Sequence, residues 1–258
     1  MKLHCFLLST TLAVLPATGA MSAVMTVHDS AGVLANVDST NGNVSIIGQM
    51  AQVMTDIAYS PAGELFGVTF NALYRINPTN AAIQLVGAFN NSGMNALVFG
   101  RNGTLYAASN ADTSLYALDT GTGAASILGN IGYRSGGDLA FVGDDLFLAS
   151  TAATLVGIDL ANNAQGTEIG PFGFSDVFGI ATDQNGALLG VAGTTIFSVD
   201  PLTGAASNPV SFAGQGLGSA WGQSFYTESG APPPPIPLPA GGVLLLSALG
   251  ALALRRRG

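Results

Sequence analysis

Apolar and polar residues alternate with a period of two over short segments along most of the chain, and turn residues separate these segments. Such alternation predicts half-buried β-strands. One unit reads DIAYSPAGELFGVTFNALYRINPTNAAIQLVG from Asp56, and the next reads NALVFGRNGTLYAASNADTSLYALDTGTGAASILG from Asn95. Each unit predicts four strands, the third closing on Asp or Asn and the fourth ending near Gly. Related segments begin at Asp138 and Gly179.

The third predicted strand fixes the repeat length. An apolar residue recurs there at steps of 39, 42, 40 and 41 residues: Leu34, Leu73, Leu115, Leu155 and Ile196. Four residues after each stands an Asp or Asn, which we expect to bond the backbone of the following turn. These residues are Asp38, Asn77, Asp119, Asp159 and Asp200. Five such strands predict five units of about forty residues each.

The first unit lacks a first strand, whereas a spare strand, LGSAWGQSFYTES, follows the last unit at 217–229. This offset is what closing a ring requires, because the late strand completes the first unit and removes the open edges. The predicted fold is therefore an all-β, five-bladed β-propeller of four-stranded antiparallel blades over 24–230. Its unit length and turns resemble those of bacterial WD-like or NHL-like propellers, without the Trp-Asp signature. A β-sandwich, the alternative, explains neither the repeat nor the displaced strand.

The N-terminal segment predicts a cleaved signal peptide over 1–23, with its signal helix. Lys2 precedes an apolar run at 6–15, and small residues then favour a cut after Ala20 or Ala23. The run is too short to cross about 30 Å of hydrocarbon. The only cysteine, Cys5, lies in this segment, so we expect no disulfide or thiol chemistry in the mature protein.

The C-terminal segment reads APPPPIPLPAGGVLLLSALGALALRRRG from Ala231. It predicts a proline-rich linker at 231–235 and a hydrophobic C-terminal helix at 240–254. At about 1.5 Å per residue that helix reaches only about 22 Å, which suits a transient hold in the inner membrane. The closing arginines, which favour the cytoplasmic side, are Arg255, Arg256 and Arg257. An ordinary tail anchor is the alternative.

The order of linker, motif, apolar stretch and arginines resembles PEP-CTERM sorting signals, most closely the VPLPA variant. The motif, with isoleucine in place of valine, is Ile236, Pro237, Leu238, Pro239 and Ala240. The resemblance covers only the segment 236–258. It implies export across the inner membrane of a Gram-negative bacterium and a membrane-anchored precursor. An exosortase-type protease would then process it for the cell surface or extracellular space, alongside exopolysaccharide and biofilm components.

Composition narrows the chemistry of the body at 24–230. Its fifteen acidic residues face three arginines, which gives a formal net charge of −12 and disfavours nucleic-acid binding. His28 is its only histidine, so we expect no zinc cluster and no Cys–His couple. No phosphate-binding glycine loop precedes a predicted helix. We therefore expect no cofactor and no metal.

Blade connections and second-to-third-strand loops share one face of such a ring, and loops on a rigid scaffold are where binding residues gather. The candidate ligand face consists of Asp56, Asn95, Tyr133, Arg134, Asp138 and Asp176. We interpret Asp56, Asn95 and Asp138 as one series, either turn caps or a polar ring, and Tyr133–Arg134 as a possible sugar contact. Trp221 is expected in the core, and Asp144–Asp145 in a solvated turn on the opposite face.

These observations favour an exported, non-catalytic interaction module on the surface or in the extracellular matrix, with surface proteins or exopolysaccharide as partners. One alternative is a carbohydrate-binding module for exopolysaccharide. A second is a glycoside hydrolase or lyase that uses carboxylates in the channel. No catalytic residue is assigned.

Overall fold

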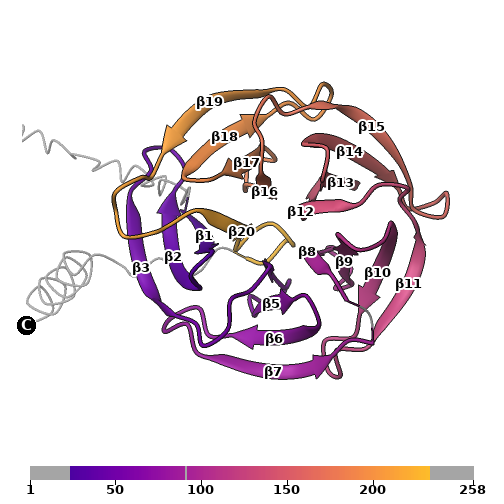
Figure 1. Ribbon diagram of the computed structural model, residues 1–258, viewed down its shortest axis with the longest axis horizontal. Coiled ribbons are helices and arrows are strands. Elements are labelled where there is room, and N and C mark those ends of the chain that lie inside the picture. The colour runs from indigo at the N-terminus through magenta and orange to yellow at the C-terminus, as the bar shows by residue number, and fades with distance from the viewer. Residues whose placement is uncertain (1–23, 91, 233–258) are drawn as a thin grey trace, which may run out of the picture.

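The computed structural model describes residues 24–90 and 92–232. These residues form five four-stranded antiparallel sheets arranged around a central axis (Figure 1). The predicted five-bladed β-propeller, its repeat and the number of strands per blade are confirmed.

The blades follow the chain, each from its innermost to its outermost strand. Blade 1 contains β20 (Ala220–Phe225), β1 (Val24–Asp29), β2 (Val33–Asp38) and β3 (Val44–Gln49). Blade 2 contains β4 (Asp56–Tyr59), β5 (Leu65–Thr69), β6 (Ala72–Ile76) and β7 (Ile83–Ala88). Blade 3 contains β8 (Met94–Phe99), β9 (Leu105–Ser109), β10 (Ser114–Leu118) and β11 (Ala125–Asn130). Blade 4 contains β12 (Ser135–Val142), β13 (Asp145–Ser150), β14 (Thr154–Asp159) and β15 (Gln165–Pro171). Blade 5 contains β16 (Val177–Thr182), β17 (Leu188–Ala192), β18 (Thr195–Val199) and β19 (Ala206–Ser211).

The late strand closes the ring as predicted. β20 pairs antiparallel with β1, from Met25 opposite Phe225 to Asp29 opposite Ala220. In Figure 1 the yellow-orange β20 accordingly lies beside the indigo β1 at the centre of the ring. Blade 1 is thus built from both ends of the described chain, and the inner edge of β1 is covered by β20.

The predicted fold class also included an N-terminal signal helix and a C-terminal hydrophobic helix, and this part is corrected. Residues 24–90 and 92–232 contain strands and turns but no helix, so the fold class is all-β without helical additions. The segments 1–23 and 236–258, on which the two helices were expected, lie outside the described residues. Within the described part of the chain, no helix is long and apolar enough to cross a membrane.

The repeated third-strand residues fill the core. Leu34, Leu73 and Leu155 are fully buried, and their two equivalents are 0–1% exposed. The apolar residues form five clusters, each between two neighbouring blades; one, for example, joins Phe66 of β5 to Phe99 of β8. The Asp or Asn that closes each third strand accepts a backbone N–H two residues later, which confirms the predicted turn chemistry. The donors are Thr40, Thr79, Gly121, Ala161 and Leu202.

Glycines on the outer strands let neighbouring blades approach. Gly87 of β7 faces the Thr122 carbonyl in the next blade's turn, and a Cβ at Gly87 would overlap that oxygen. Gly129 of β11 faces the Asn163 carbonyl in the same way. In these two blades the glycine near the end of the fourth strand is therefore a contact point with the next blade, because only a residue without Cβ fits there.

Candidate functional site

The pairing register identifies equivalent positions on the five innermost strands. In every blade, one residue of the innermost strand pairs with a residue of the second strand, and that residue pairs in turn with the buried Leu or Ile of the third strand. The five positions are Asp56, Ala96, Asp138, Gly179 and Gly222. Two of five thus carry a carboxyl group, one in blade 2 and one in blade 4.

Both carboxyl groups tie their blade to the next one. Asp56 is fully buried; its Oδ2 accepts the N–H of Leu97 at 2.6 Å, and its Oδ1 accepts that of Ile57 at 2.8 Å. Asp138 repeats this pattern, with Oδ2 accepting the N–H of Ile180 at 2.8 Å and Oδ1 that of Leu139 at 2.7 Å. These bonds satisfy buried backbone donors that the strand ladders leave unpaired.

The two aspartates also hydrogen-bond each other across the axis, which requires a proton on one of them. Burial raises the pKa of Asp56 well above its usual range, and burial together with the charge of Asp56 does the same for the pKa of Asp138. We therefore treat them as a pair that shares a proton. Glu228, just after β20, lies close enough to repel both, and burial raises its pKa to about 8.

Glu228 lies in the segment that follows β20, and residues of β16 and β20 hold its carboxyl group. Its Oε1 accepts the N–H of Thr182 at 3.1 Å, and its Oε2 accepts the hydroxyl of Ser224 at 3.1 Å. Unlike the two aspartates, Glu228 is partly exposed and lines a small pocket with Arg101 and Asp183. It therefore keeps some contact with solvent.

His28 lies fully buried beside the aspartate pair. A Cβ at Gly222 would lie 2.5 Å from Asp56 Oδ1 and 2.6 Å from His28 Nε2, so both atoms lie next to Gly222. Neither ring nitrogen of His28 has a hydrogen-bond partner. Burial lowers its pKa to about 4, which keeps the ring neutral at ordinary pH.

A pocket of about 210 Å³ lies where the five innermost strands begin, at one end of the ring's central axis, and we call it the mouth pocket. Five of its residues stand one position before the equivalent series, one from each blade: Thr55, Asn95, Gly137, Phe178 and Trp221. Phe70 and Asn110, from the second-to-third-strand loops of blades 2 and 3, join them together with Gly136. The pocket therefore lies on the face of the ring where the sequence predicted the ligand-binding residues. Its lining contains three aromatic rings and two amides, and no charged side chain.

Asn95 is the polar residue in this pocket with unused bonding capacity. Its side chain is 7% exposed, and Nδ2 donates to the Ser135 carbonyl at 3.2 Å. Oδ1 is buried without a partner. A buried acceptor left unpaired is costly, so the pocket favours a ligand that brings a hydrogen-bond donor to this oxygen.

The structure separates the six residues predicted for the ligand face. Asn95 lines the mouth pocket, whereas Asp56 and Asp138 meet below it, in the buried centre. Tyr133 packs against the apolar cluster between blades 3 and 4, and the side chains of Arg134 and Asp176 are exposed away from the pocket.

Two interpretations from the sequence were wrong. Asn95 does not belong to the series of Asp56 and Asp138, because a register shift between Met94 and Ala96 places Ala96 there. Trp221 is half-buried at the mouth rather than in the core, since it precedes Gly222. Phe70, Phe178 and Asn110 were not singled out. Phe70 and Asn110 lie in second-to-third-strand loops, which were expected on this face, whereas placing Phe178 requires the correct register of β16.

Among the described residues, no group of three or more His, Cys, Asp or Glu side chains is arranged to hold a metal ion.

Comparison with known proteins identifies the fold. No family model matches the sequence, and no curated protein sequence matches it either. A solved structure from work on the de novo evolutionary emergence of a symmetrical protein has a TM-score of 0.52 and 16% identity, covering 76% of this chain and 95% of that one. A chain of a nidogen/laminin complex has a TM-score of 0.54 and 10% identity, covering 79% and 85%. The gluconolactonase XC5397 from Xanthomonas campestris has a TM-score of 0.51 and 14% identity, covering 75% and 78%. At these identities the likeness extends to the propeller fold alone.

Proposed function

We propose that this chain is an exported, non-catalytic interaction module that binds a neutral carbohydrate at the mouth pocket. The observation that carries the proposal is the unpartnered Oδ1 of Asn95 in a pocket with three aromatic rings. Aromatic faces stack on the apolar faces of sugar rings, and a sugar hydroxyl supplies the missing donor. The volume of about 210 Å³ is below the ~300–1,000 Å³ of pockets for drug-sized ligands, so one sugar residue fits better than a chain.

The carboxyl groups of the channel support a role without catalysis. An acid–base pair that cleaves a glycosidic bond must reach substrate from two sides. Asp56 and Asp138 are 0–1% exposed, and their oxygens are occupied by backbone N–H groups of the neighbouring blades. Their arrangement suits joining blades better than contacting a substrate.

The net charge of −12 over residues 24–230 should affect which polysaccharides bind. Like-charge repulsion would disfavour an anionic polymer, so we expect neutral exopolysaccharide to bind better than acidic exopolysaccharide.

Replacing Trp221 with alanine should weaken binding of the full chain to a neutral matrix polysaccharide about tenfold or more, because a stacking ring is lost. Asn95→Ala should weaken it about fivefold, since one hydrogen bond is lost. Affinity electrophoresis in gels containing the polysaccharide measures both effects. Arg134→Ala, an exposed change outside the pocket, is the matched control and should bind like wild type.

The two alternative hypotheses, a binding site at Tyr133–Arg134 and a hydrolase, predict different results for the same variants and polysaccharide. Loss of binding in Arg134→Ala with none in Trp221→Ala would move the site to Tyr133–Arg134. New reducing ends that appear with wild type and disappear in Asp138→Asn would instead favour a hydrolase. Either result contradicts the proposal.

We further propose that the segment 236–258 is processed by an exosortase-type enzyme, as its resemblance to PEP-CTERM signals implies. In a host that carries such an enzyme, intact mass should show loss of the C-terminal segment and release to the surface or medium. A Pro237→Ala/Pro239→Ala variant should remain uncut. A chain that keeps the same mass with and without the enzyme would identify the segment as an ordinary anchor.

A further inference from the structure

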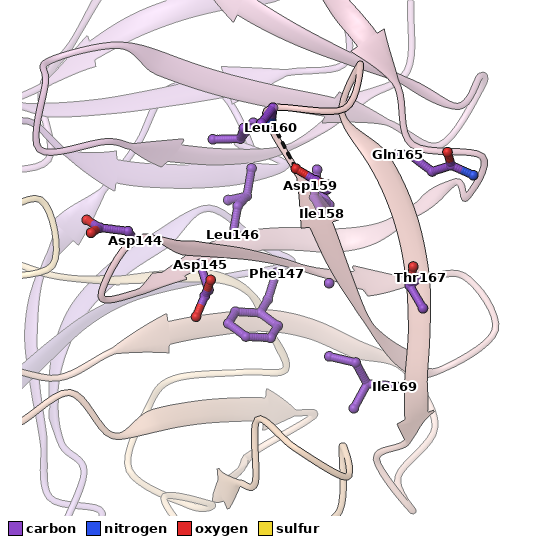
Figure 2. Close-up of a pocket in the computed structure, with 12 residues that line it drawn as sticks. Asp144, Asp145, Leu146, Phe147, Ile158, Asp159, Leu160, Gln165, Thr167 and Ile169 are labelled. Carbon is purple, nitrogen blue, oxygen red and sulfur yellow. Dashed lines mark hydrogen bonds between the residues drawn. The ribbon is translucent and has the colours of Figure 1, made fainter.

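A second pocket, of about 530 Å³, lies on blade 4 beside the β12–β13 and β14–β15 turns, on the face opposite the mouth pocket. Figure 2 shows Asp144 and Asp145 on one side, Gln165 and Thr167 of β15 on the other, and Phe147 between them. The carboxylates of Asp144, Asp145 and Asp159 line it, and no lysine or arginine does.

Blade 2 has a pocket of about 480 Å³ at the equivalent place, and an arginine lies against the aromatic ring there. Phe66 of β5 stands opposite Arg75 of β6 in the strand ladder. The guanidinium carbon of Arg75 lies 5.1 Å from the centre of the Phe66 ring, and its Nη1 lies 2.9 Å from Glu64 Oε1. An aromatic face and a carboxylate two residues before it thus hold one guanidinium group.

Blade 4 repeats the aromatic ring and the acid but not the cation. Phe147 of β13 occupies the position of Phe66, and Asp145 stands two residues before it, as Glu64 does in blade 2. The residue opposite Phe147 is Gly157, where blade 2 has Arg75. Among the described residues, neither Asp144 nor Asp145 forms an ion pair with a cation. Phe147 is 7% exposed and Phe66 only 1%, which fits the missing cover.

We propose that the blade 4 pocket binds the guanidinium group of an arginine side chain from a partner protein, in the place that Arg75 fills in blade 2. A planar guanidinium can stack on the ring while its N–H groups reach the carboxylate, which a lysine ammonium cannot do equally well. The other three blades lack the combination: blade 1 has Val24 with Thr26, blade 3 has Thr104 with Tyr106, and blade 5 has Ala187 with Leu189. This site is independent of the carbohydrate pocket.

The space for the arginine follows from Gly157. A Cβ built there would lie 3.4 Å from Ile169 Cδ1, an ordinary contact, so a side chain can begin at this position without a backbone clash. The chain can therefore be given its own occupant: Gly157→Arg should place a guanidinium over Phe147 and close the site.

The test is titration of the full chain with an acetylated, amidated tri-arginine peptide and with its tri-lysine counterpart, followed by calorimetry. Wild type should bind tri-arginine with a Kd on the order of millimolar and tri-lysine several-fold more weakly. Gly157→Arg and Phe147→Leu should each reduce tri-arginine binding about tenfold or more. Arg75→Gly should open the same surface in blade 2 and raise the stoichiometry from one to two.

Circular dichroism and the Tm of each variant show that it is folded, and Phe147→Leu keeps the proposal testable if Gly157→Arg does not fold. Because the chain itself ends in Arg255–Arg257, the titration is repeated with these arginines changed to glutamine. Binding only in that variant would mean that the chain's own tail fills the pocket, which supports the chemistry. Equal binding of both peptides, unchanged binding in folded Gly157→Arg, or no binding in either background would overturn the proposal.

Discussion

Replacing Gly87 with alanine should destabilise the propeller by about 3 kcal/mol, because the new methyl group would overlap the Thr122 carbonyl of the next blade. Backbone on both sides leaves no flexible side chain to move aside. For a domain of this size, 1 kcal/mol changes the Tm by about 2–4 °C, so we expect a fall of about 6–12 °C. Gly129→Ala, which meets the Asn163 carbonyl, should behave alike. Thermal unfolding followed by circular dichroism measures both.

Gly157→Ala is the matched control for this effect. It also adds one methyl group to a strand of a blade, but the nearest atom to the new Cβ would be 3.4 Å away. We expect its Tm to stay within about 2 °C of wild type. If Gly87→Ala unfolds at the same temperature as Gly157→Ala, close contact between blades does not require the glycine.

Raising the pH from 6.5 to 8.5 should lower the stability by on the order of 2 kcal/mol, because each pKa unit is worth about 1.4 kcal/mol. Burial raises the pKa of Asp56 and Asp138 and brings that of Glu228 to about 8. The folded state therefore holds protons that the unfolded state has released by pH 5, and it loses this advantage as the pH rises through the folded pKa values. The Tm measured across this range should fall by about 4–8 °C.

The pH range from 6.5 to 8.5 is chosen so that the titration of His28 does not contribute to the change in stability. Its pKa is lowered to about 4, so His28 makes the protein more stable as the pH rises from 4 to 6.5 and contributes no change above that. In Asp138→Asn the pair no longer shares a titrating proton, and the slope above pH 6.5 should become shallower. A slope that is the same in both proteins would assign the pH effect to Glu228 instead of the aspartate pair.

The fold could be predicted from sequence because its signals repeat. One Leu or Ile and one Asp or Asn recur at the same places in the third strand, and five copies average out the irregularity of any single strand. Ring closure could be predicted from the number of strands, since the first unit lacked one strand and the segment after the last unit supplied it. Each signal was local, and the side-chain period of two made it visible.

The candidate site could be predicted only in part, because it depends on register. The innermost strands carry irregularities, such as the shift between Ser135 and Asp138, that move a side chain by one position without changing the apolar pattern. A slip of one residue turns a side chain to the other face. Asn95 was therefore grouped with Asp56 although it lines the mouth pocket, and Trp221 was assigned to the core although it lines the same pocket.

The pairing of β20 with β1 also sets the order in which the ring can be completed. Among the strands of the described residues, β1 is made first, and its partner on the inner side, β20, is made last. Until β20 has been made, β1 lacks its inner neighbour and exposes a row of free N–H and C=O groups that could pair with another chain. Such long-range pairing is slow compared with the local pairing inside the other four blades. The residues 236–240 follow soon after β20, so the ring becomes able to close shortly before this segment is made.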